Sequence, residues 1–178
     1  AIDDNPELAG MKDQVKLDLT KEGLKVQIID KEGRPMFPSA SARMFERTKI
    51  LLATVTSVIK DLPNKVELSG HTDAKPFRGG NRRYGNWELS SDRANSTRRM
   101  LEVFGLDNSR IIKVTGRAER DPLVKDDLIS PRNRRISIML LHKVKPPPAV
   151  VKPVKPKAKP VKKKTRNKAG SKGNKAPD

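Results

Sequence analysis

Apolar and polar residues alternate in two short runs near the start of the chain. Residues 15–19 and residues 24–28 each carry an apolar side chain at every second position. A period of two is typical of a strand with one buried face. The residues between the two runs end in Gly23, which suits a tight turn. The pattern therefore predicts an antiparallel hairpin.

Two longer segments follow the helical period instead. In residues 44–62 the apolar side chains recur along one stripe, at Met44, Leu51, Leu52, Val55, Ile59 and Leu62. A second helix is predicted over residues 86–104, and Gly105 suits the left-handed position that closes a helix.

Three further apolar segments, at residues 66–68, 111–115 and 134–142, are predicted strands. Strands separated by helices of this length require at least one crossover connection, which joins parallel strands. We therefore expect an α/β (α+β) two-layer sandwich, in which a mixed β-sheet carries two main helices on one face.

The composition divides the chain into a domain and a tail. The 178 residues carry a net charge of +18, and residues 144–178 hold twelve Lys or Arg, one acidic residue and seven of the fourteen prolines. Such a segment has too few apolar side chains to bury a core. We predict a flexible lead-in at residues 1–14, a folded domain at 15–143 and a disordered basic tail at 144–178.

Other features of the composition exclude whole classes of site. No stretch approaches ~18 uninterrupted apolar residues, so no transmembrane segment is expected in this chain. The absence of cysteine rules out disulfides and thiolate chemistry, and two histidines are too few for a histidine-rich metal cluster. We expect no metal and no cofactor.

Arg93 is the first candidate for binding chemistry. It lies four residues after Leu89 and four before Thr97, so it projects from the edge of the buried helical stripe. A partly buried guanidinium needs a partner. Asn86 lies on the same side near the helix start, where free backbone N–H groups favour an anion.

Arg134 gives a similar signal in the last strand, because it shares a strand face with Ile136 and Ile138. Asp73, after a neighbouring strand, is the natural carboxylate between Arg134 and Arg93. One interpretation is a structural salt-bridge network. The other is a pocket for a zwitterionic ligand, in which Asp73 accepts the ammonium and Arg93 holds the carboxylate.

Three sequence blocks carry a resemblance to a known family. They are Gly-His-Thr-Asp at 70–73, Asn-x-x-Leu-Ser-x-x-Arg-Ala at 86–94 and Asn-Arg-Arg-Ile at 133–136. Over residues 20–142 the chain resembles OmpA-like peptidoglycan-binding domains. That family has a β/α sandwich and binds the diaminopimelate of the cell-wall stem peptide.

The resemblance implies roles for individual residues. Asp73 is similar to the ammonium acceptor of the family, Arg93 to its carboxylate clamp and Arg134 to the arginine beside them. The motif positions that shape the pocket correspond to Thr72, Asn86 and Leu89.

The chain departs from the general family in an expanded loop at residues 74–85. This expansion resembles the version found in flagellar motor stator subunits. The resemblance implies the periplasmic domain of a single-pass inner-membrane protein, whose transmembrane segment is not in this chain. It also implies a homodimer that anchors the stator to peptidoglycan for motility, with partner subunits of the MotA type.

The segment around Pro35 and Phe37 precedes the first helix. In proteins of this type the stretch between membrane and wall-binding domain controls stator activation, so both residues are regulatory candidates. An ordinary loop with Phe37 in the core is the alternative, and the sequence leaves both open.

The composition leaves two other classes of function to consider. The net charge of +18 and the basic tail favour binding to nucleic acid or another polyanion, but aromatic residues make up only 3% of the chain and no nucleic-acid-binding motif is present. For an enzyme, no serine lies in a nucleophile-elbow context and no paired carboxylates suggest glycosidase chemistry. We expect a non-catalytic protein without a specific nucleic-acid partner.

Overall fold

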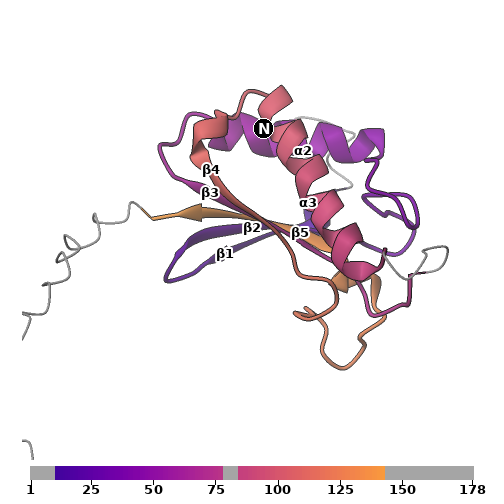
Figure 1. The fold of residues 1–178 in the computed structure, drawn as a ribbon. Coiled ribbons are helices and arrows are strands. Elements are labelled where there is room, and N and C mark those ends of the chain that lie inside the picture. The colour runs from indigo at the N-terminus through magenta and orange to yellow at the C-terminus, as the bar shows by residue number, and fades with distance from the viewer. Residues whose placement is uncertain (1–10, 78–83, 143–178) are drawn as a thin grey trace, which may run out of the picture. The chain divides into compact units, whose positions relative to one another are not determined.

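The computed structural model describes residues 11–77 and 84–142 (Figure 1). The predicted tail at 144–178 and most of the predicted lead-in lie outside the described residues. The elements in chain order are η1 (Lys12–Gln14), β1 (Val15–Leu19), β2 (Gly23–Ile29), α2 (Glu46–Ile59), β3 (Val66–His71), α3 (Asn86–Val103), η2 (Asn108–Arg110), β4 (Ile111–Gly116), η3 (Pro131–Asn133) and β5 (Arg135–Leu141).

These strands form one five-stranded sheet with the order β1-β2-β5-β3-β4. The pair β3 and β4 is parallel, and the other neighbours are antiparallel. Helices α2 and α3 both lie on one face of the sheet, as Figure 1 shows. The prediction of a two-layer sandwich with a mixed sheet is therefore confirmed.

The core lies between the sheet and the two helices. Val26, Ile138 and Leu68 are paired across β2, β5 and β3, and each is at most 3% exposed. Leu51 from α2 and Leu101 from α3 are fully buried in the same cluster. The alternation in the strands and the stripes on the helices thus meet in a single apolar layer.

Helix α3 approaches the sheet closely where two strands carry glycine. A methyl group at Gly70 would lie 2.1 Å from the carbonyl oxygen of Ser90, and one at Gly116 would lie 2.1 Å from the Ser91 hydroxyl oxygen. Glycine at these two positions lets the N-terminal half of α3 lie directly on the ends of β3 and β4.

The packed domain begins earlier than the predicted boundary at residue 15. Met11 is 5% exposed and belongs to the core cluster. The Gln14 side-chain amide donates hydrogen bonds to the carbonyl oxygens of Ile29 and Arg34, both at 3.0 Å. Residues 11–14 are therefore part of the domain, because one apolar side chain and one buried amide attach them to it.

Candidate functional site

Strand pairing brings three distant segments to one end of the sheet. Ile29, Arg135 and His71 form the last paired row across β2, β5 and β3. Asp30 follows this row on β2, and Arg134 precedes it on β5, so the two residues are neighbours beyond the sheet. Thr72 and Asp73 follow β3 in the same way.

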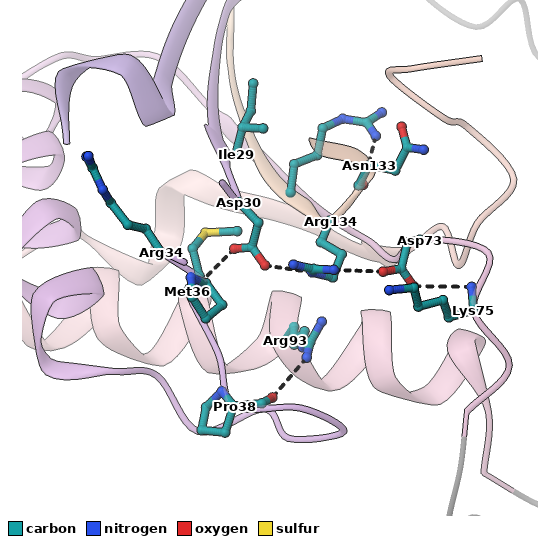
Figure 2. A network of polar contacts seen from close by, with 12 residues as sticks. Ile29, Asp30, Arg34, Met36, Pro38, Asp73, Lys75, Arg93, Asn133 and Arg134 are labelled. Carbon is teal, nitrogen blue, oxygen red and sulfur yellow. Dashed lines mark hydrogen bonds and ion pairs between the residues drawn. The ribbon is translucent and has the colours of Figure 1, made fainter. Parts of the chain in front are cut away.

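Arg134 is the centre of the polar contacts at this end (Figure 2). Its Nε donates to Asp30 Oδ2 and its Nη1 donates to Asp73 Oδ2, each at 2.8 Å. Asp30 Oδ1 also accepts from the Met36 backbone N–H at 2.7 Å, and Asp73 Oδ1 accepts from the Lys75 N–H at 3.2 Å. Both carboxylates are therefore held in place from two sides.

Arg93 reaches this site from α3 and is 5% exposed. Its Nε donates to the Ser41 carbonyl oxygen at 2.9 Å and its Nη2 to that of Pro38 at 3.3 Å. The guanidinium carbon lies 4.9 Å from the centroid of the Phe37 ring, within the range of a cation–π contact. Arg93 thus holds the loop before α2 against the site.

The pKa values of these groups reflect burial opposed by pairing. Burial acts to lower the pKa of Arg134, but its hydrogen bonds to Asp30 and Asp73 outweigh burial and raise that pKa above its ordinary value. Burial raises the pKa of Asp30, against the effect of Arg134 and Met36. Burial also lowers the pKa of Arg93, against the nearby Asp30 carboxylate.

A cavity of about 670 Å³ opens at this end of the domain. All six residues predicted to bind ligand line it, and so do the two regulatory candidates: Thr72, Asp73, Asn86, Leu89, Arg93, Arg134, Pro35 and Phe37. The remaining walls come from Ser39, Ala40, Lys75, Pro76 and Phe77. The structure therefore brings every predicted site residue to a single cavity.

The smaller pocket residues have distinct surroundings. The Asn86 side-chain amide donates to the carbonyl oxygens of Asp73 and Lys75 and to Glu119 Oε2, at 3.2 to 3.4 Å. Asn86 therefore ties the start of α3 to the turn that carries Asp73. Thr72 Oγ1 is buried and makes no hydrogen bond within the described part of the chain.

The structure differs from the expected geometry in one respect. We expected Asp73 to stand between two arginines, but the hydrogen bonds of Arg93 go to backbone carbonyls and only Arg134 forms an ion pair with Asp73. The second carboxylate partner of Arg134 is Asp30, which follows β2 directly and was not among the predicted site residues. Its position one residue beyond a buried strand was the signal that could have found it.

Of the two alternatives for the segment around Pro35 and Phe37, burial matches the second. Phe37 is 4% exposed and Met36 is 2% exposed, and both belong to the core cluster. The regulatory role of Pro35 and Phe37 stays a prediction.

Part of the expanded loop at 74–85 lies outside the described residues, which stop at Phe77 and resume at Tyr84. The ring centroids of Phe77 and Tyr84 lie 5.1 Å apart, and the Tyr84 hydroxyl donates to Asp92 Oδ2 at 2.7 Å. The described residues on the two sides of this gap are therefore in contact, and Phe77 lines the cavity.

Residues 11–77 and 84–142 show neither a metal-binding cluster nor a helix able to span a membrane. They contain no group of three or more His, Asp or Glu side chains placed to hold a metal ion. Neither α2 nor α3 has the length and apolar content needed to cross a membrane, and the same holds for every other helix in this part of the chain.

Comparison with known proteins agrees with the three sequence blocks. Residues 36–135 match the OmpA family, which is more than half of the chain, and the chain belongs to that family. It is 42% identical over 148 residues to Motility protein B of Escherichia coli strain K12, a match that covers 80% of this chain and 46% of that protein. The chain thus spans about half the length of this relative.

Solved structures give the same architecture. The cell wall anchor of the T6SS from Pseudomonas aeruginosa is similar with a TM-score of 0.62 and 26% identity, covering 76% of this chain and 94% of that one. The periplasmic domain of Helicobacter pylori MotB is similar with a TM-score of 0.63 and 16% identity, covering 73% and 83%. This second likeness concerns the fold alone.

Proposed function

We propose that this domain binds the peptide stem of peptidoglycan and anchors a flagellar motor stator to the cell wall. The observation that carries the proposal is the cavity that is lined by one carboxylate, Asp73, and by two guanidinium groups, Arg93 and Arg134. The similarity to Motility protein B and to a cell wall anchor supports the same function.

The ligand we propose is the zwitterionic centre of diaminopimelate. Asp73 accepts two hydrogen bonds in the structure, and a carboxylate offers about four acceptor sites, so it can also accept an ammonium. Arg93 uses two of its five N–H donors on the loop, and the others serve the ligand carboxylate. The Thr72 hydroxyl supplies a further hydrogen bond.

In this proposal the domain works by binding alone and catalyses no reaction. It acts in the periplasm as part of a single-pass inner-membrane protein, as a homodimer with partner subunits of the MotA type. Nucleic acid is not a specific partner, so any DNA binding should be independent of sequence and fall steeply with added salt.

The direct test is a pull-down of the protein with purified peptidoglycan sacculi. The wild-type chain should sediment with the sacculi, and Asp73→Asn should remain in solution because the ammonium loses its counter-charge. Asp61→Asn is the matched control, since Asp61 is an exposed aspartate in the turn after α2. Equal sedimentation of folded Asp73→Asn and wild type would contradict the proposal.

A further inference from the structure

Asp30 is a carboxylate that lies behind the wall of the cavity. It is 2% exposed and does not belong to the residues that line the cavity. Both of its oxygens are engaged inside the protein, Oδ1 by the Met36 N–H at 2.7 Å and Oδ2 by Arg134 Nε at 2.8 Å (Figure 2). Asp30 can therefore influence a bound ligand only indirectly, through Arg134 and Met36.

The first of these effects is on Arg134. A guanidinium that faces a single carboxylate tends to form a bidentate fork and to engage both of its oxygens. Here Nε is held by Asp30, and only Nη1 reaches Asp73, at 2.8 Å. Asp30 thus prevents Arg134 from occupying the carboxylate that an ammonium would need.

The second effect is on the charge of the site. Among the buried and half-buried groups, Arg93 and Arg134 carry two positive charges and Asp30 and Asp73 carry two negative charges, so these four groups are balanced. Lys75 also lines the cavity, but its side chain is exposed and solvent screens its charge. Without Asp30 the remaining three would have a net charge of +1. In a site this buried, one unit of charge separates ligands strongly, because solvent screens it little.

The third effect is on the wall of the cavity. The hydrogen bond from Met36 to Asp30 fixes the residue before Phe37, whose ring lies against Arg93. One buried carboxylate therefore positions Arg134 directly and Arg93 through the loop.

We propose that Asp30 is the positioning residue that makes this cavity select a zwitterionic centre over a ligand carrying carboxylates alone. The inference rests on the proposed function, because it concerns the ligand preference of the same cavity. Asp30 lies outside the three sequence blocks. It would determine ligand specificity by balancing the charge of the site and by fixing the orientation of the Arg134 guanidinium.

The test compares two probes on the full chain by isothermal titration calorimetry. Diaminopimelate has ammonium and carboxylate groups, whereas N,N′-diacetyl-diaminopimelate keeps the carboxylates and has no ammonium. Wild type should bind the first more tightly. The preference is measured as the dissociation constant of the diacetyl form divided by that of diaminopimelate. In Asp30→Asn, whose amide oxygen can still accept from Met36, this ratio should fall by about tenfold or more. Asp61→Asn should leave the ratio unchanged.

A double variant separates charge balance from damage to the fold. Arg134→Gln alone leaves a net charge of −1 on the remaining three groups, whereas Asp30→Asn with Arg134→Gln leaves one positive and one negative charge and so restores the balance. The double variant should therefore prefer diaminopimelate over its diacetyl form more than Asp30→Asn does. If Asp30→Asn fails to fold, Arg134→Gln is the reference, and its affinity for the diacetyl form should be lower than that of the double variant.

The outcomes distinguish the two proposals. The role of Asp30 would be overturned, and wall binding left intact, if folded Asp30→Asn kept the wild-type ratio or if the double variant had the same ratio as Asp30→Asn. Where Arg134→Gln is the reference, equal affinity of the two variants for the diacetyl form would overturn it. A wild-type chain that binds neither probe and does not sediment with sacculi would overturn the proposed function and this inference together.

Discussion

Gly70 and Ser90 lie so close that a methyl group on Gly70 would stand 2.1 Å from the Ser90 carbonyl oxygen. No side chain can occupy that space, and the obstacle is helix backbone, which cannot turn aside as a flexible side chain can. The contact determines how near α3 lies to β3, and so how near Arg93 lies to Asp73.

Gly70→Ala should therefore destabilise the domain. Overpacking of this kind costs about 1–3 kcal/mol, and here the only relief is a shift of α3 away from the sheet. Chemical denaturation would measure the change. Ser69→Ala is the control, because Ser69 is on the other face of β3 and should change stability by less than about 0.5 kcal/mol. Equal midpoints for Gly70→Ala and wild type would contradict the close packing.

Arg93→Ala should weaken binding to sacculi by one to two orders of magnitude. The estimate follows from the loss of a charge-assisted hydrogen bond to the ligand, worth about 1.5–3 kcal/mol. Arg98→Ala is the matched control on the same helix, since Arg98 forms an ion pair with Glu102 and does not line the cavity. Arg93→Ala that is folded and binds as well as wild type would show that Arg93 serves only to hold the loop.

The fold could be predicted from the sequence because its signals are local. The period of two over residues 15–19 and 24–28 corresponds to β1 and β2, and the second helix was predicted over 86–104 and is observed over Asn86–Val103. The first helix was predicted too long, because apolar residues at 44 and 62 continue the stripe beyond the ends of α2, Glu46–Ile59.

The site was only partly predictable, because its contacts join distant parts of the chain. Asp30 and Arg134 are 104 residues apart, and only the pairing of β2 with β5 brings them together. The partners of Arg93 are the backbone carbonyls of Pro38 and Ser41, which no side-chain pattern reveals. The three sequence blocks identified the groups of the cavity, whereas the hydrogen bonds between them required the structure.

Hydrogen exchange should divide the segment at residues 30–42 into protected and open parts. The Met36 amide donates to the buried Asp30 carboxylate, so it should exchange slowly. Gly33 and Ala40 lie in exposed turns and should exchange fast. This differs from uniformly fast exchange, which a wholly mobile regulatory segment would give. Met36 exchanging as fast as Gly33 would show that the loop opens independently of the core.

Acid should destabilise the domain through His71. This side chain is 3% exposed, and burial, together with the charge of Arg135, lowers its pKa from 6.5 to about 3. Its Nδ1 has no hydrogen-bond partner within the described residues and lies 3.8 Å from Asp121 Oδ2. The imidazole is therefore neutral in the folded protein at a pH where the unfolded chain is already protonated.

The sign of the effect follows from proton uptake. Below pH 6.5 the unfolded chain binds a proton at His71 that the folded chain does not bind until the pH nears 3, so the stability due to the neutral imidazole is full above pH 6.5 and lost as the pH falls. Between pH 6.5 and 4.5 the loss should be about 2–3 kcal/mol. Urea denaturation at a series of pH values measures it. His71→Gln should flatten this slope whatever its stability at pH 7, and His142→Gln, at an exposed position after β5, should keep the wild-type slope. A slope in His71→Gln as steep as in wild type would assign the acid sensitivity to carboxylates instead.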